Sequence, residues 1–190
     1  MSFYGAASEY GIHCLLHLAN VPEGVWPSAR DVADFQGVSS AYVAKLFTQL
    51  QKAGIVQSSG GKSGGFRLAR AAENISVLDV VDAVEGKSPL FRCREIRKNC
   101  VLFQNKDPDW TQRGVCAIHA TMRAAEVRMR DVLAQKTLAS LTRAVAVKQT
   151  ASEGTATREW FDHRQFTRRQ PDRPLKAMRG RRVVLANKNH

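Results

Sequence analysis

Three of the four cysteines in this 190-residue chain lie close together and are the first sign of chemistry in the sequence. Cys93, Cys100 and Cys116 fall in or just after a stretch predicted to be irregular, whereas Cys14 lies in an apolar helix and is most simply a core residue. Loops can direct several thiolates to one point, as metal or iron–sulfur binding requires. His119 follows Cys116 by one helical turn and offers a nitrogen ligand. The spacing matches no zinc-finger pattern, so these residues indicate metal, cluster or redox chemistry without choosing among them.

A second group of polar side chains interrupts the first predicted helix, residues 6–19, which is otherwise apolar around most of its surface. Glu9, His13 and His17 occur at every fourth position and therefore share one stripe of the helix. Glu9 and His13 lie one turn apart, so both side chains can reach one metal ion. A plain polar helix face explains the same stripe, because His17 continues it.

The segments that follow predict a helix-turn-helix. Ser28 can cap a helix over residues 29–35, with Asp31 at the capping-box position, and a glycine ends this helix. Ser39 can cap a second helix, residues 40–53, in which apolar residues recur at the i, i+3, i+4 and i+7 spacing of a buried stripe. Two helices joined by a short glycine-containing turn are typical of this DNA-binding motif.

A β-hairpin is predicted directly after the second helix. Residues 55–57 and 66–68 have the composition of short strands, and the glycine-rich turn SSGGKSGG joins them. A hairpin at this place is the wing of a winged helix, in which glycines let the backbone approach phosphates while Lys62 and Arg67 add charge. The turn lacks the G-x-x-x-x-G-K-[ST] spacing of a nucleotide-binding loop and leads into a strand, so we exclude that function.

The DNA-reading surface follows from this motif, because the N-terminal part of the second helix enters the major groove. Hydroxyl and amino groups off the apolar stripe can reach base edges or phosphates, and the wing adds further charge. The predicted DNA-contacting residues are Ser28, Ser39, Ser40, Tyr42, Lys45, Lys62 and Arg67. A merely solvated helix face is the alternative, and the adjoining wing and the positive net charge make it the weaker interpretation.

Further elements complete a mainly α-helical fold with a small β wing. Ser76 can cap a short helix that continues to Val84 and ends at Gly86, and an irregular stretch, residues 87–114, follows. A long helix is then predicted over residues 115–135, with apolar side chains recurring at helical spacing. An exposed helix this long and this apolar needs a partner, and a second copy of the chain is the simplest one.

The chain carries a formal charge of +12, from 29 basic and 17 acidic side chains, which favours an anionic partner and above all nucleic acid. Residues 1–147 hold 18 basic and 13 acidic side chains, whereas residues 148–190 hold 11 basic and 4 acidic ones. This tail has weak periodicity and many arginines. We therefore expect it to be mostly disordered, and either solvated or in non-specific contact with DNA phosphates.

Other classes of protein fit the sequence less well. No run of about 18 apolar residues could span a bilayer, and the N-terminus lacks the layout of a signal peptide. We therefore expect a cytoplasmic protein whose cysteines do not form structural disulfides. No motif places a base beside a nucleophile, so we do not expect an enzyme. A basic RNA-binding protein is a rival, although it has no need for three loop cysteines.

The segment SEYGIHCLLHLA, the segment from VSSAYVAKLF to VVDAVEG, the cysteine region and the long helix together resemble the Rrf2 family of winged-helix transcription repressors. The resemblance covers about residues 1–145 and is specific, because motif order, wing and cysteine region all agree. The chain then divides into a winged helix-turn-helix domain at 1–86, a cluster-binding loop at 87–117, a dimerisation helix with a short following helix at 115–147, and the basic tail at 148–190.

Within the family, the sequence is most similar to iron–sulfur redox sensors of the RsrR type. The segment EYGIH in the first helix and FRCREIR at 91–97 carry this likeness, together with the cysteine and apolar residue that open the long helix. The resemblance implies a 2Fe-2S cluster at a dimer interface, with a carboxylate and an imidazole from one subunit and two thiolates from the other. The implied ligands are Glu9, His13, Cys93 and Cys116, with Cys100 and His119 in reserve.

These inferences predict a homodimeric DNA-binding transcription regulator, most simply a repressor, that responds to redox, iron–sulfur or nitrosative status through its cluster. The predicted partners are double-stranded operator DNA and a second copy of the chain. The main alternative is a regulator of the same fold without a cluster, in which Cys93 and Cys100 form a redox-sensitive disulfide.

Overall fold

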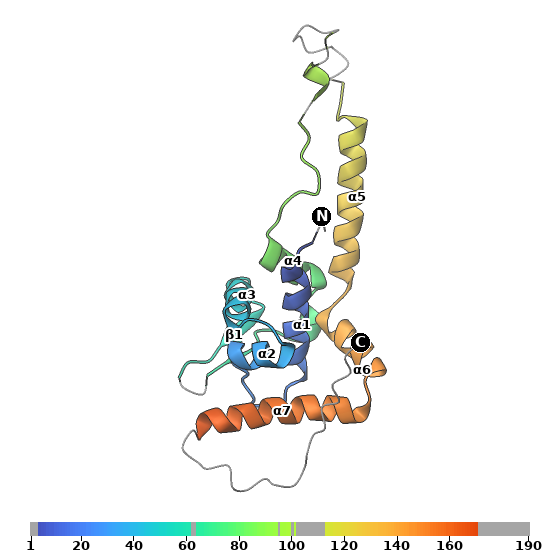
Figure 1. The fold of residues 1–190 in the computed structure, drawn as a ribbon. Helices are drawn as coiled ribbons and strands as arrows, with labels where there is room; N and C mark the ends of the chain where they lie inside the picture. The colour runs from blue at the N-terminus through green and yellow to red at the C-terminus, as the bar shows by residue number, and fades with distance from the viewer. Residues whose placement is uncertain (1–3, 62–63, 95, 100, 102–112, 171–190) are drawn as a thin grey trace, which may run out of the picture.

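The computed structural model describes residues 4–61, 64–94, 96–99, 101 and 113–170. Within them the chain is mostly helical with a two-stranded antiparallel sheet (Figure 1), which confirms the predicted fold class. No helix among these residues is both long enough and apolar enough to cross a membrane. In chain order the elements are α1 (Ala6–Asn20), α2 (Ala29–Gln36), α3 (Ser40–Lys52), β1 (Val56–Ser58), β2 (Phe66–Leu68), the 3-10 turn η1 (Ala72–Asn74), α4 (Val77–Glu85), the 3-10 turn η2 (Ile96–Asn99), α5 (Ala117–Gln135), α6 (Leu138–Lys148) and α7 (Ala151–Arg169).

The helix-turn-helix begins and ends where its capping residues predict. Ser28 and Asp31 form a reciprocal capping box at the start of α2, in which each side chain accepts a hydrogen bond from the other residue's backbone N–H. Gly37 ends α2 in the left-handed conformation, with φ of 71°. Ser39 precedes α3 as predicted, but its side chain makes no capping hydrogen bond.

The predicted wing is the antiparallel pair β1 and β2, in which Gln57 lies opposite Arg67. The first strand begins one residue later than the pattern predicts. Ile55 lies in the turn that closes α3, where its backbone N–H donates to Leu50 O at 2.9 Å. Only this tight turn, residues 53–55, separates α3 from the wing, so the position of the helix constrains the position of the hairpin.

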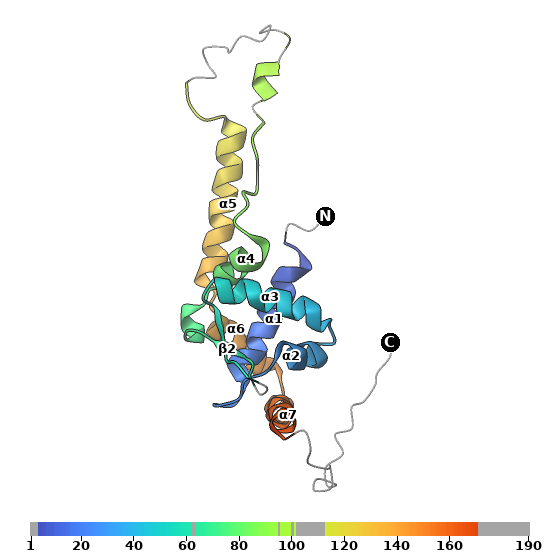
Figure 2. The ribbon, with the colours of Figure 1, turned by 90° about the vertical axis from the view of Figure 1, so that its left-hand side faces the viewer.

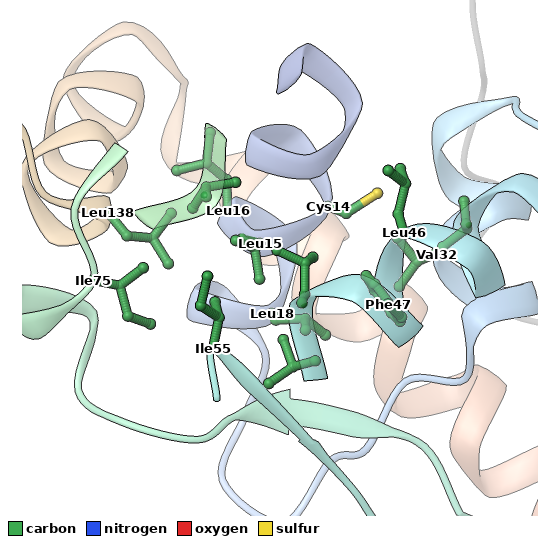
Figure 3. Packing of buried hydrophobic residues seen from close by; sticks show 14 of the residues in the cluster. Cys14, Leu15, Leu16, Leu18, Val32, Leu46, Phe47, Ile55, Ile75 and Leu138 are labelled. Atoms are coloured by element: carbon green, nitrogen blue, oxygen red, sulfur yellow. The ribbon is translucent and has the colours of Figure 1, made fainter. Parts of the chain in front are cut away.

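The core lies where α1 meets α2, α3, α4 and α6, and Figure 3 shows its buried side chains. Cys14 is fully buried there, which confirms its assignment as a core residue. The apolar stripe predicted for the second helix faces this core from α3. Its members are Val43, Leu46, Phe47 and Leu50, each at most 2 % exposed.

The helix α5 leaves this body as a long arm, and the described residues that follow α4, residues 86–94, run beside it (Figure 1). No residue of α5 is buried in the single chain. Apolar side chains stay exposed along the arm, with exposed fractions between 55 % and 68 %, at Val115, Ile118, Val127 and Val132. Such a surface is costly to leave in water, so the arm has the properties expected of a dimerisation helix.

The basic tail differs from the sequence prediction, because its first part is folded. Residues 151–169 form α7, which begins with a capping box between Thr150 and Glu153 and crosses beneath α2 (Figures 1 and 2). Phe161 is 1 % exposed and its ring packs at 5.0 Å from that of Phe35. The prediction of disorder was therefore wrong for this helix, because Phe161 and Trp160 dock an otherwise polar segment on the core. Residues 171–190 lie outside the described part of the chain.

Candidate nucleic-acid interface and cluster ligands

The exposed side of α3 carries the residues predicted to read DNA. Ser39, Ser40 and Lys45 are all exposed at or near the start of this helix, opposite its buried apolar stripe. Tyr42 is half-buried instead, and its ring lies edge-on to that of Tyr10, with centroids 5.6 Å apart. This ring pair links α3 to α1, a contact that the sequence did not predict.

Ser28 lies at the start of α2, and its polar groups are already engaged. Its hydroxyl accepts the Asp31 N–H at 3.1 Å, and its own N–H donates to the Asp31 carboxylate at 2.8 Å. The side chain is half-buried, in a cleft whose other wall is formed by Arg164 and Arg168 of α7. Ser28 therefore organises the helix-turn-helix, and the structure does not group it with the exposed residues of α3.

The wing packs against the loop that precedes α2. Phe66 N–H donates to Pro27 O at 2.8 Å, and a Cβ on Gly65 would collide with the carbonyl oxygen of Trp26. The guanidinium of Arg67 is exposed and lies over the Trp26 ring, 4.4 Å from its centroid. Lys62, the other predicted wing contact, lies outside the described residues. The contact of Trp26 with the wing could not be predicted from the sequence, because nothing in its local pattern indicates a tertiary contact.

Two arginines of the tail face the protein. The guanidinium of Arg164 pairs with Asp31 at 3.2 Å and also with Asp34, and Arg168 pairs with Asp31 at 3.1 Å. Asp31 is only 3 % exposed, so its charge needs these partners. These two charges therefore neutralise carboxylates of α2 and do not form an exposed basic surface.

The first pair of predicted cluster ligands lies on the body of the molecule. Glu9 and His13 are both exposed and lie one turn apart on α1. His17, the third member of the stripe, has a different environment: its Nε2 lies 2.6 Å from Gln36 Oε1, and its ring packs edge-on to Phe35 at 4.8 Å. Burial lowers the pKa of His17 below 6.5, and the hydrogen bond to Gln36 opposes this effect in part. The stripe thus separates into an exposed pair and a packing histidine.

The second pair, Cys93 and Cys116, lies on the arm. Both side chains are half-buried. The ring of Phe91 contacts that of His119, with centroids 6.1 Å apart, and Leu90 N–H donates to the Glu126 carboxylate at 3.2 Å. The segment around residues 90–93 therefore runs antiparallel to α5 and leads Cys93 toward the start of this helix, where Cys116 is the N-cap residue.

The two pairs lie apart within one subunit, because α1 belongs to the body and α5 begins at the far end of the arm (Figure 1). Accordingly, the described part of the chain contains no group of three histidine, cysteine or acidic side chains able to hold a metal ion. Cys100 lies outside the described residues, and the reserve ligand His119 is half-buried on the same arm as the two cysteines.

Contacts between helices connect α1 to the arm. The Glu85 carboxylate accepts the N–H groups of Gly5 at 2.9 Å and Ser8 at 3.3 Å, so a side chain of α4 caps the start of α1. On the same helix, Asp82 forms a two-point ion pair with Arg130 of α5, with N–O distances of 2.9 and 2.7 Å. Neither contact could be predicted from the sequence, since capping signals within one helix do not reveal a cap supplied by another.

The fold and the exposed side of α3 define a winged helix-turn-helix DNA-binding protein. The model of the Rrf2 family, described as "Iron-dependent Transcriptional regulator", matches residues 4–144. The chain therefore belongs to the Rrf2 family of transcriptional regulators, proteins that bind DNA and are not enzymes. The helix α7 lies beyond the matched residues.

Solved structures of similar proteins agree with this assignment. T. potens IscR is 23 % identical, with 79 % of this chain and 93 % of that chain covered and a TM-score of 0.59. CymR (YrzC), described as the global cysteine regulator of B. subtilis, is 23 % identical over 76 % and 98 % of the two chains, with a TM-score of 0.54. The oxidized form of Staphylococcus aureus CymR is 27 % identical over 75 % and 96 %, with a TM-score of 0.50. These likenesses support the winged-helix fold.

Proposed function

We propose that this chain is a dimeric transcription repressor whose binding to operator DNA depends on a 2Fe-2S cluster shared between two subunits. The observation that carries the proposal is the separation of the expected ligands: Glu9 and His13 lie exposed on α1 in the body, whereas Cys116 is the N-cap residue of α5 and Cys93 follows Phe91, which contacts His119 in the first turn of α5. The start of α5 is the far end of the arm (Figure 1). Pairing of two arms through their exposed apolar side chains would bring the cysteines of one subunit toward α1 of the other.

The donor chemistry suits such a cluster. Cysteine thiolates are the usual ligands of iron–sulfur clusters, and imidazole ligands in place of thiolates raise the reduction potential. His13 and Glu9 are exposed on adjacent turns of α1, so neither has to leave the core to bind a metal. When bound, the cluster would supply a one-electron redox couple. The likeness to IscR and the description of the family as iron-dependent regulators support this assignment.

Existing contacts offer a route from this site to DNA. The ring of Tyr10, adjacent to Glu9, packs on Tyr42 of the recognition helix. Glu85 caps the start of α1 from α4, and α4 is bound to the arm by the ion pair of Asp82. A change in the position of α1 would therefore alter both the placement of α3 and its relation to the dimer arm. Because the half-sites of an operator lie about 34 Å apart, a small change in dimer geometry can prevent simultaneous docking.

The proposed DNA contacts are the exposed groups at the start of α3 and on the wing. Ser39 and Ser40 can donate hydrogen bonds to phosphates or bases, Lys45 can reach a phosphate or a guanine, and Arg67 adds charge on the second strand. Residues 4–147 provide little excess charge, so the specificity of binding depends on where these few groups are placed.

Anaerobic isolation tests the cluster directly, by visible absorbance, electron paramagnetic resonance and analysis for iron and sulfide. We expect cluster absorbance and equal amounts of iron and sulfide in the protein, as a 2Fe-2S cluster contains. The variant His13→Ala should lose or shift the visible spectrum. His163→Ala, which alters an exposed histidine of α7, is the matched control and should leave the spectrum unchanged.

A cluster-free thiol sensor of the same fold is the second candidate, and the likeness to a structure described as an oxidized form of CymR favours it. Colourless protein without iron or sulfide after anaerobic isolation would contradict the cluster proposal. In that case a change of operator affinity on oxidation, abolished by Cys93→Ser, would establish the thiol mechanism.

A further inference from the structure

The last turn of α7 is attached to three parts of the DNA-binding unit through one side chain. The guanidinium of Arg168 donates to Gly64 O in the wing at 3.1 Å and to Trp26 O in the preceding loop at 2.8 Å. It also pairs with the carboxylate of Asp31 in α2 at 3.1 Å. A guanidinium can bind several acceptors at once because its donors form a rigid planar fork.

A buried amide of α7 strengthens the same attachment. Gln165 is 4 % exposed, and its side chain satisfies two backbone groups: its Oε1 accepts the N–H of Trp26, and its Nε2 donates to Gly24 O at 3.0 Å. Buried amides are costly unless both ends are hydrogen-bonded. Arg168 and Gln165 together therefore hold the loop before α2 through the N–H of Trp26 and through the carbonyl groups of Gly24 and Trp26.

The same loop supports the wing. Pro27 O accepts the Phe66 N–H of β2, and Trp26 lies against Gly65 and under the guanidinium of Arg67. A continuous set of contacts thus runs from α7 through the loop to the hairpin. Because isolated two-stranded hairpins are only marginally stable in water, the orientation of this wing depends on such external contacts.

We infer that α7 is a strut that holds the wing and α2 in the orientation needed for DNA binding, and that Arg168 is its principal positioning residue. This inference rests on the proposed DNA-contacting surface of α3 and the wing. The charge of Arg168 is neutralised by Asp31, and its two Nη groups donate to the backbone carbonyls of Gly64 and Trp26, so it acts through the wing and not as a phosphate ligand. The strut is specific to this chain's extension, since the family model ends at residue 144.

The test compares Arg168→Ala with Arg169→Ala, its exposed neighbour, because both variants remove one positive charge from the same turn. The probe is a DNA duplex that wild-type protein, isolated anaerobically, selects from a random-sequence library. R168A removes the hydrogen bonds to Gly64 O and Trp26 O and the ion pair with Asp31. We expect this loss to lower the population of the positioned wing, and with it the affinity for the duplex, about tenfold. We expect R168A to bind about tenfold more weakly with an unchanged salt slope and without protection of the DNA beneath the wing.

The control R169A should bind at nearly wild-type affinity, or lose affinity together with about one unit of salt slope if its side chain contacts a phosphate. Equal affinity of R168A and wild-type protein, or a loss in R168A explained by the salt slope alone, overturns the strut. If R168A does not fold, the affinity of R168K for the same duplex is measured, since lysine keeps the charge but not the planar fork. An affinity between those of wild-type protein and a tenfold weaker complex supports the strut, and wild-type affinity overturns it.

Lys45→Ala separates this inference from the function on which it rests. If K45A binds the selected duplex as wild-type protein does, the proposed surface on α3 is wrong and the strut falls with it. If K45A weakens binding while R168A does not, the DNA surface stands and only the strut is overturned.

Discussion

Replacement of Phe161 by alanine tests whether α7 is an integral part of the fold. The ring is 1 % exposed and lies between Phe35 at 5.0 Å and His17 at 5.9 Å. The next ring on the same helix, Trp160, packs at 4.9 Å. Phe161 is thus the main apolar anchor of a helix whose other buried residue is Gln165.

The expected loss follows from burial and from the space that would remain. Removing a fully buried phenylalanine side chain typically costs about 3–5 kcal/mol, from lost transfer free energy and from the cavity. Because α7 lies at the edge of the core and can partly collapse or detach, we expect the lower end, about 3 kcal/mol. In a protein of this size, that corresponds to a fall in the thermal midpoint of roughly 10 °C.

The assay is urea unfolding followed by tryptophan fluorescence, since Trp160 reports on α7 itself. Phe166→Ala is the matched control, because that ring is on the same helix but 51 % exposed. We expect the free energy of unfolding of F166A to stay within about 0.5 kcal/mol of the wild-type value. Similar stability of F161A, F166A and the wild-type protein would refute the docking of α7 on the body.

The environments of single residues predict three further results. Burial raises the pKa of Cys14 to about 12. Iodoacetamide at about pH 8 should therefore modify Cys116 and leave Cys14 unmodified in native cluster-free protein, as mass spectrometry of peptides can show. Labelling of Cys14 in the native protein would contradict this prediction. Gly65→Ala should weaken binding to the selected duplex about tenfold, because the new Cβ collides with the backbone of Trp26. Gly60→Ala is the control and should bind as wild-type protein does, because its Cβ meets nothing within 4 Å. Equal affinities of the two variants would contradict the close approach of Gly65 to the loop before α2. Burial lowers the pKa of His17, so the native state binds fewer protons than the unfolded state. Its stabilising effect is present above its ordinary pKa of 6.5 and is lost as the pH falls from that value through the lowered pKa of the folded state. His17→Leu should therefore reduce the difference in unfolding free energy between about pH 7.5 and pH 5.5.

The sequence predicts the helix-turn-helix and wing well because their signals are local. Ser28 and Asp31 lie three residues apart and form the capping box that this spacing predicts. The same holds for Ser76 and Asp79 at the start of α4. The apolar stripe of α3 is buried as its period predicts, because only one side of this helix faces the core and the apolar residues recur on that side.

The first part of the tail was mispredicted because its packing does not rely on apolar periodicity. The side of α7 that faces the body presents Phe161, Gln165 and Arg168, at helical spacing but mostly polar, and hydrogen bonds to backbone groups replace apolar contacts. A signal was present all the same: Thr150 and Glu153 have the threonine-to-glutamate spacing of a capping box, which marks the start of a helix.

The candidate cluster site could be predicted only in its parts. The one-turn spacing of Glu9 and His13 and the position of the cysteines around an irregular stretch are readable from the chain. How two such pairs meet depends on the pairing of two arms, which no local pattern encodes. The exposed apolar residues of α5 indicate that a partner is needed, and they do not specify the register of the two helices.

A mixed dimer tests the shared cluster most directly. One chain carries Glu9→Ala and His13→Ala, the other carries Cys93→Ser and Cys116→Ser, and the two are co-expressed with different affinity tags and isolated anaerobically. If each cluster takes its ligands from both subunits, the mixed dimer keeps one complete site, and we predict half the iron, sulfide and visible absorbance of the wild-type dimer, while either variant alone has none. A mixed dimer without iron or sulfide, from a wild-type protein that contains both, would contradict the sharing of ligands between subunits.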